Sequence, residues 1–159
     1  ARTRNKLRWT SYTAFRSPVS PALPFNGVSM IVIYGIKEKL NPIRSQMSAV
    51  IHSCLMSTLG LPEPKRFHRF IPMDKDDFYY SIEDGRTDSY TVLEINLMEG
   101  RKKETIKSLI KAIFSEFDKQ LGISVTDVEI IIHEQPAHCW GFRGMSGDEA
   151  KDLTYKINV

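Results

Sequence analysis

The spacing of apolar positions predicts a strand, a helix and a second strand in the first half of this chain. Residues 30–36 are a short β-branched and aromatic run, which is typical of a strand. Residues 42–60 carry apolar side chains at helical spacing, begin with a proline suited to a first helical turn and end at a glycine. Residues 66–71 alternate in polarity as far as Pro72, so we expect this proline to close the second strand.

The same order of elements recurs after a polar loop over residues 74–89. Residues 90–98 form another β-branched and aromatic run, and residues 106–121 return to helical spacing. Residues 127–133 predict a last strand, which Pro136 stops. The second half therefore predicts the same strand, helix and strand as the first.

The residues that end the helices and the outer strands are spaced alike in the two halves, so the two halves have nearly the same length. Gly60 and Gly122, which end the two helices, lie 62 residues apart, and Pro72 and Pro136 lie 64 residues apart. Because each parallel crossover is right-handed, both helices are expected on the same face of the sheet. We predict an α/β fold in which two tandem β-α-β units form a four-stranded mixed sheet with two helices on one face. The other face is too apolar to meet water, so we expect subunits to associate.

Residues 1–29 differ from the rest in charge and in pattern. They contain five basic residues, no acidic residue, three prolines and no hydrophobic period. We expect a disordered basic extension, because such a segment buries too little apolar surface to offset its ordering entropy. Three origins stay open: a transit peptide, a basic arm for nucleic acid or anionic membrane, and a tag or early start with Met30 as the true first residue. The folded domain is then residues 30–159.

Charge and cysteine content narrow the class of protein. The net charge of +3 falls to about −2 for residues 30–159, so we expect no nucleic-acid partner except through residues 1–29. Cys54 and Cys139 are too few for a disulfide framework and suit free thiols in a reducing compartment. No apolar run approaches the roughly 18 residues that span a bilayer. We therefore expect no membrane partner and a cytoplasmic location, or an organellar one if the extension is a transit peptide.

Short motifs follow one another in a specific order along residues 30–145. They are Leu59-Gly60-Leu61-Pro62 with Lys65-Arg66-Phe67, Glu99-Gly100-Arg101 with Lys107, Leu121-Gly122-Ile123 with Asp127-Val128, His133-Glu134, and Trp140-Gly141-Phe142 with Gly144. In these motifs the chain resembles the tautomerase superfamily, whose fold is MIF-like. It is most similar to the branch that contains 4-oxalocrotonate tautomerase, malonate semialdehyde decarboxylase and the chloroacrylate dehalogenases.

This resemblance implies a homotrimer with active sites at the subunit boundaries. In the family, the amine of an N-terminal proline transfers the proton, since an α-amino group titrates near neutral pH. Arginines nearby hold the carboxylate of a small substrate through paired hydrogen bonds. The family's proline position falls at Ser29 and Met30 in this chain, so the catalytic proline is absent and we assign no catalytic residue.

Two further positions depart from the family pattern. One arginine of the family's usual pair is kept as Arg101, whereas its companion position holds Glu99. An acidic residue that the decarboxylases use with the proline falls on Lys65. Decarboxylation and dehalogenation are therefore poorly supported. A simple keto–enol proton shift requires fewer catalytic groups.

We take Arg101, Glu134, His68 and Trp140 as candidate substrate-binding residues. Arg101 stands where the family places a carboxylate-binding cation, although an arginine after a glycine turn is also often solvated. Glu134 ends the last predicted strand, where an edge polar group is the commoner role. His68 alternates with its neighbours and could face a pocket, but a structural histidine is more common. Trp140 lies in a glycine-rich loop, where core or interface packing is the usual role.

The sequence offers no metal or cofactor motif. His133, Glu134 and His138 straddle a proline, which breaks the helical spacing of a zinc site, and the aspartates near residue 75 lack the glycine and glutamate of a calcium loop. We expect neither a metal nor an organic cofactor. The function expected is a tautomerase-like isomerase for small 2-oxo or enol carboxylic acids, weak because the proline is absent. The alternatives are a non-catalytic trimeric binding or scaffold protein, and a protein that binds nucleic acid through its basic arm.

Overall fold

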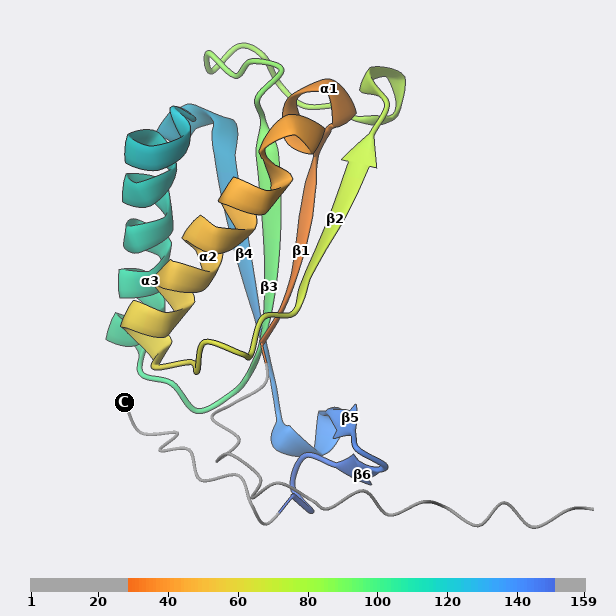
Figure 1. Cartoon of the computed structure of the whole chain (residues 1–159), viewed down its shortest axis with the longest axis vertical. Helices are drawn as coiled ribbons and strands as arrows, with labels where there is room; N and C mark the ends of the chain where they lie inside the picture. The colour runs from red at the N-terminus through yellow and green to blue at the C-terminus, as the bar shows by residue number, and fades with distance from the viewer. Residues whose placement is uncertain (1–28, 151–159) are drawn as a thin grey trace, which may run out of the picture.

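The computed structural model describes residues 29–150, in which two β-α-β units share one sheet (Figure 1). The first unit consists of β1 (Ser29–Ile36), α1 (Lys37–Leu40), α2 (Arg44–Leu59) and β2 (His68–Met73). The second consists of β3 (Thr91–Met98), α3 (Lys103–Glu116) and β4 (Val128–Gln135), followed by a small hairpin of β5 (Gly141–Phe142) and β6 (Met145–Ser146). The doubled unit predicted from the sequence is therefore confirmed.

Both long helices end at the glycines that the sequence marks. Gly60 follows α2 with φ of 67°, and Gly122 has φ of 64° after the π-helical turn that extends α3. Both angles lie in the left-handed region, which glycine adopts without the steric penalty of a side chain. The amide of Gly60 donates to the carbonyl of Met56 at 3.0 Å, which closes the last turn of α2.

The sheet has the order β2-β1-β3-β4. The two central strands, β1 and β3, are antiparallel, and each is parallel to its own outer partner. This order is the pseudo-twofold arrangement that two equal right-handed units produce. Helices α2 and α3 lie side by side over one face of the sheet (Figure 1).

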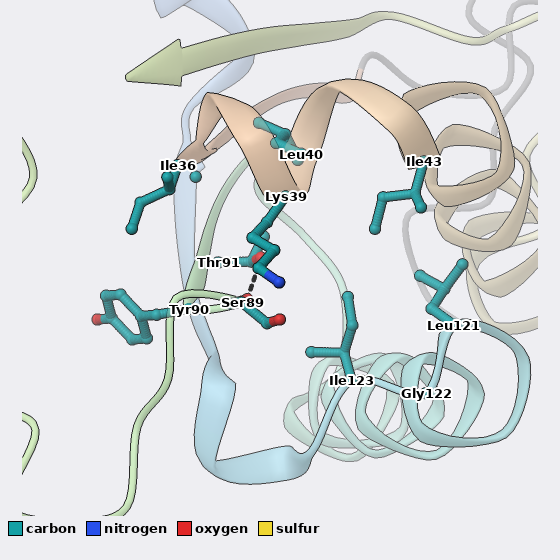
Figure 2. A pocket seen from close by; sticks show the side chains of 11 residues that line it. Ile36, Lys39, Leu40, Ile43, Ser89, Tyr90, Thr91, Leu121, Gly122 and Ile123 are labelled. Carbon is teal, nitrogen blue, oxygen red and sulfur yellow. Dashed lines mark hydrogen bonds between the residues drawn. The ribbon is translucent and has the colours of Figure 1, made fainter. Parts of the chain in front are cut away.

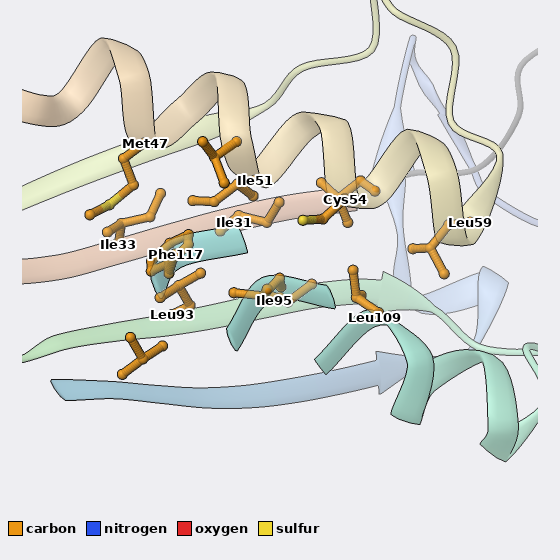
Figure 3. Close-up of a cluster of buried hydrophobic side chains, with 14 of the residues drawn as sticks. Ile31, Ile33, Met47, Ile51, Cys54, Leu59, Leu93, Ile95, Leu109 and Phe117 are labelled. Atoms are coloured by element: carbon orange, nitrogen blue, oxygen red, sulfur yellow. The ribbon is translucent and has the colours of Figure 1, made fainter. Parts of the chain in front are cut away.

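The core lies between that face and the two helices (Figure 3). Alternate residues of the central strands, among them Ile31, Ile33, Leu93 and Ile95, are fully buried there. Their helical counterparts include Met47, Ile51, Leu55, Leu109, Ile113 and Phe117, which are also inaccessible to solvent. Period-two burial on the strands and period-3.6 burial on the helices explain why the sequence pattern located both kinds of element.

The opposite face of the sheet has no covering layer among residues 29–150. Strand register places Val32, Tyr34, Glu94 and Ile131 on this face, because each alternates with a buried core position. Ile131 remains 44% exposed, and Ile71 on β2 remains 41% exposed. Isoleucine side chains this exposed on a broad strand surface are typical of a face that packs against another chain.

The structure corrects the sequence interpretation of β2. Pro72 was expected to close this strand, but it lies inside the strand and pairs with Gly35 of β1. The physical reason is that β2 is an edge strand, where a residue without an amide hydrogen leaves no inner hydrogen-bond ladder broken. The strand also begins at His68, two residues later than expected, and the helical segment begins at Lys37, before Pro42.

Residues 1–28 and 151–159 lie outside the described part of the chain. The predicted disorder of the basic extension therefore stays a prediction, except that its last residue, Ser29, is the first residue of β1. Within the described residues, no helix combines the length and the apolar character needed to cross a bilayer.

Candidate functional site

A pocket of about 370 Å³ opens at the end of the sheet where β1 begins. Ser29 and Met30, where the sequence resemblance predicted the reacting proline to fall, form part of its wall. The remaining side-chain lining comes from two distant segments and contains the cations Lys65, Arg69 and Arg143 and the aromatic rings of Phe67, Trp140 and Phe142. One wall is therefore formed by the start of β1 together with residues 65–69, which lead into β2. The other wall is formed by the hairpin after β4.

Backbone hydrogen bonds fix the strand side of this pocket. The amide of Ile31 donates to the carbonyl of Phe67 at 3.0 Å, which joins the segment before β2 to the start of β1. The side-chain amide of Asn96 donates to the carbonyl of Met30 at 3.2 Å. The Arg69 guanidinium contacts the thioether of Met30. The position of Arg69 follows from strand parity, since its partner in the register, Val32, also points away from the helices.

The hairpin β5–β6 supplies the other wall and extends beyond the end of the sheet (Figure 1). Phe142 pairs with Met145, which leaves Arg143 and Gly144 as a two-residue loop. Their φ angles of 53° and 78° define a type I′ turn. Arg143 is the one non-glycine residue with positive φ in the described part of the chain. A side chain held in this conformation carries steric strain, which is concentrated at functional sites in proteins.

Trp140 is the sequence-predicted candidate that lines this pocket. Its backbone is held by two hydrogen bonds, from its own amide to Ala137 at 3.1 Å and from the amide of Gly147 to its carbonyl at 2.8 Å. Its indole nitrogen is buried and has no acceptor among the described residues. A buried donor without an acceptor is costly, so an oxygen atom from a ligand or another subunit suits this position.

The charge of the pocket favours an anion. Its lining holds three cationic side chains, and none of its described lining residues is acidic. Burial, together with the positive charge of Arg143, lowers the pKa of Lys65 below that of an ordinary lysine. Arginine is suited to hold a carboxylate through two parallel hydrogen bonds. The arrangement can therefore bind a small carboxylate whose apolar part lies against the aromatic rings.

The strained turn gives a test of this geometry. Replacing Arg143 by Asn should raise the free energy of unfolding by about 0.5–1 kcal/mol, because Asn-Gly is the preferred pair in a type I′ turn and tolerates positive φ. Urea unfolding of the wild type and the variant would measure the change. Arg66→Asn, in an exposed arginine outside the hairpin, is the control and should not be stabilised. An Arg143→Asn protein less stable than the wild type would contradict the strain at this residue.

Arg101 and Glu134 lie at the same end of the sheet but do not line the pocket. Leu97 pairs with Ser29 on one side and with Glu134 on the other, which brings the start of β1 and the end of β4 level with each other. Arg101 follows four residues after Leu97 and donates to the carbonyl of Met98 at 2.8 Å. Glu134 is exposed. Their assignment to substrate binding stays a prediction.

His68 faces the helices rather than the pocket. Its register partner is the core residue Ile31, and its Nδ1 lies 2.9 Å from the hydroxyl of Ser48 on α2. The ring of His52 lies 6.1 Å away in an edge arrangement. Burial, with electrostatic interactions from the neighbouring His52 and Arg66, lowers the pKa of His68 to about 4. This environment suits a neutral structural histidine, and the prediction that His68 contacts substrate gains no support from it.

The lowered pKa of His68 predicts a loss of stability in acid. The unfolded pKa of histidine is near 6.5, so the unfolded state binds more protons than the folded state between pH 6.5 and pH 4. Stability is therefore complete above pH 6.5 and falls as the pH drops through this window. We expect about 1–2 kcal/mol of loss from this residue, after discounting for its partial exposure.

Two histidine variants would isolate this contribution. His68→Gln keeps a hydrogen-bonding group for Ser48 but does not titrate, so its unfolding free energy should fall less between pH 7 and pH 4.5 than that of the wild type. His138→Gln removes an exposed imidazole and serves as the control. An unchanged pH dependence in His68→Gln would contradict the assignment.

A second pocket, of about 200 Å³, lies at the opposite end of the sheet (Figure 2). It opens between the end of β1, the start of β3 and the turn after α3, and its lining includes Ile36, Leu40, Tyr90 and Ile123. Lys39 is the one cationic side chain among its described lining residues. This pocket lacks the paired arginines of the first, which is therefore the better anion site.

Sequence reasoning missed two of the cations in the first pocket. Arg69 could have been found from strand parity, because it points to the face opposite that of His68. Arg143 belongs to a hairpin of two-residue strands, for which Arg143-Gly144 gives a weak turn signal. No group of three or more metal-binding side chains occurs within residues 29–150, and the expectation of no metal or cofactor stays a prediction.

Comparison with known proteins identifies relatives of this chain. A family model described as tautomerase enzyme matches residues 65–143, the segment that begins at Lys65 and ends at Arg143. The probable tautomerase YusQ of Bacillus subtilis (strain 168) is 26% identical over 100 residues, which cover 61% of this chain and 79% of that protein.

Solved structures show the same fold at lower sequence identity. Malonate semialdehyde decarboxylase has a TM-score of 0.70 and 17% identity, covering 79% of this chain and 99% of that chain. A fused 4-OT solved as an asymmetric trimer has a TM-score of 0.66 and 14% identity, covering 76% of this chain and 97% of that chain.

Proposed function

Because the chain belongs to the tautomerase superfamily, we propose that it is a tautomerase-like isomerase that catalyses keto–enol proton transfer on small 2-oxo or enol carboxylic acids. The observation that carries this proposal is the pocket at the start of β1. Its two arginines, Arg69 and Arg143, suit the carboxylate, and the rings of Phe67, Trp140 and Phe142 suit the apolar remainder of the substrate.

The absence of an acidic residue from the described lining favours proton transfer over decarboxylation. Stabilising an enolate requires positive charge near the developing negative oxygen, and the three cations of this pocket supply it. Decarboxylation would need an acidic side chain in the pocket. None lies among its described lining residues, and Lys65 stands where the resemblance places that acid. An isomerase needs a carboxylate anchor, an electrophilic group for the oxygen and one proton-transferring group.

The proposed active form is a homotrimer. The sheet face that carries Ile71 and Ile131 is uncovered in the single chain, and the fused 4-OT was solved as a trimer. Association through this face would bury its apolar side chains. It also offers a route by which Arg101 or Glu134, at the same end of the sheet as the pocket, could reach the pocket of a neighbouring subunit.

A spectroscopic assay tests the proposed activity. The full chain should accelerate the ketonisation of phenylenolpyruvate, followed by the loss of the ultraviolet absorbance of the enol. In D₂O, the same protein should exchange the C3 hydrogens of the keto acid, which proton nuclear magnetic resonance detects. A non-catalytic trimer that only binds carboxylates is the alternative, and Ser29 and Met30, which replace the family's amine, favour it. Rates no higher than those of buffer in both experiments would select this alternative.

A further inference from the structure

The first pocket contains one lysine amine, that of Lys65, in a cationic and partly apolar setting. Arg69 and Arg143 contribute guanidinium groups, which act in proteins as fixed positive charges and not as proton-transfer groups. Lys65 carries a primary amine, and losing its proton relieves its repulsion with Arg143. The proton released most readily from this cluster is therefore that of the Lys65 amine.

The surroundings of Lys65 also favour the neutral amine. The side chain is half-buried and shares the pocket lining with Phe67, Trp140 and Phe142. Burial lowers its pKa, and the charge of Arg143 lowers it further. Apolar walls and adjacent cations are the two conditions under which lysines become bases or nucleophiles in enzymes.

The position of Lys65 is fixed by the backbone around it. Its amide donates to the carbonyl of Pro62 at 3.0 Å, and two residues later the carbonyl of Phe67 accepts from Ile31 in β1. The Lys65 side chain is thereby held in the same pocket as Ser29 and Met30, where the family resemblance places the reacting amine. The pocket thus contains an amine at a site where these two positions supply no proline.

We propose that the ε-amine of Lys65 is the catalytic base of this pocket, an inference that rests on the proposed isomerase function. The neutral amine removes a proton from C3 of a bound 2-oxo acid and becomes an ammonium group. The electrons of the broken C–H bond form the C2–C3 double bond, and those of the carbonyl π bond move to its oxygen. The ammonium group then returns the proton to that oxygen, which gives the enol, and the reverse sequence gives the keto acid.

Substrate binding assists this step. A carboxylate bound to Arg69 and Arg143 offsets part of their positive charge, which raises the affinity of Lys65 for a proton. The lowered pKa makes the neutral amine easier to reach in the empty pocket than in an exposed lysine, and the amine becomes a stronger base once the substrate is bound. Proton transfer is most efficient when the pKa of the base lies near the working pH.

Kinetics of one substitution would separate a catalytic base from a binding cation. Lys65→Arg keeps the positive charge but removes the titrating amine, so kcat for ketonisation should fall by about 10²–10⁴-fold while KM changes little. Exchange of the C3 hydrogens in D₂O should fall by the same factor. Lys111→Arg, in an exposed position on α3, is the matched control and should keep the wild-type rate.

Chemical labelling gives a readout that does not depend on turnover. Competitive acetylation with acetic anhydride across a pH series, read by peptide mass spectrometry, should show Lys65 reacting at a lower pH than Lys111. Phenylpyruvate should protect Lys65 and leave Lys111 labelled.

The outcomes distinguish the two proposals. An active wild type with equally active Lys65→Arg overturns the role of Lys65 and leaves the isomerase function standing. An inactive wild type overturns both. Labelling of Lys65 at the same pH as Lys111, with no protection by phenylpyruvate, also overturns the role of Lys65.

Discussion

Ile131→Lys is expected to convert the proposed trimer into monomers that keep their fold. Ile131 is 44% exposed on the uncovered face of the sheet, and its register partner on β3 is Glu94. In the monomer, a lysine at this position is exposed to solvent and lies opposite Glu94 on the neighbouring strand. A pair of opposite charges across two strands is favourable. In a trimer that buries this face, the same ammonium group loses water, at a cost of about 3 kcal/mol or more per subunit.

Light scattering coupled to size-exclusion chromatography would measure the mass of the particle. We expect the dissociation constant to rise at least a hundredfold, which about 3 kcal/mol produces, while far-ultraviolet circular dichroism stays unchanged. Val125→Lys replaces another exposed aliphatic residue, in the turn before β4, and should leave the oligomer intact. A wild type that is already monomeric, or an Ile131→Lys protein that stays trimeric, would rule out assembly through this face.

Arg69→Met is expected to lower kcat/KM for a 2-oxo acid by about 10²-fold, mainly through a higher KM. The substitution keeps much of the aliphatic volume beside Met30 but removes the charge-assisted hydrogen bonds to a carboxylate, which contribute about 2–3 kcal/mol. Steady-state ketonisation kinetics would separate the effects on KM and kcat. Arg44→Met, in an exposed arginine at the start of α2, is the matched control.

The family resemblance assigns carboxylate binding to Arg101, so Arg101→Met belongs in the same series. If Arg101 reaches the pocket of a neighbouring subunit, its substitution should raise KM in the trimer, and combining it with Ile131→Lys should add no further increase. If Arg69→Met keeps the wild-type KM while Arg101→Met loses binding, the carboxylate is held by Arg101 and our placement of the anion is wrong.

The doubled fold could be predicted because its signals are local and occur twice. Gly60 and Gly122 end equivalent helices, and both adopt the left-handed conformation that makes glycine the favoured residue there. The uncovered sheet face fits the expectation that subunits associate, although this face carries polar side chains such as Glu94 beside Val32 and Ile131. The prediction that Pro72 ends the strand was wrong. A proline is tolerated inside β2 because β2 is an edge strand, and the order of strands in the sheet cannot be read from local sequence.

The candidate site was predicted less completely than the fold. Trp140, a predicted candidate, lies in the pocket lining, and its contact with substrate stays a prediction. Lys65 was noticed as a departure from the family pattern. Arg143 was missed because its hairpin has strands of two residues, too short for a periodic signal. His68 was named as a candidate and Arg69 was not, although neighbouring strand residues point to opposite faces and only one of them can face the helices. That choice depends on which face the helices cover, which tertiary structure determines.

Pro72 has a consequence for how copies of this protein can join. An outer strand with every amide hydrogen available can recruit a further strand, and repeated recruitment leads to open-ended fibres. The pyrrolidine ring interrupts that possibility near the end of β2, because it offers no amide hydrogen to an incoming strand. Growth along this border is discouraged, which agrees with the proposed association of copies through the broad surface around Ile131. That bias favours a closed particle of fixed size over a polymer.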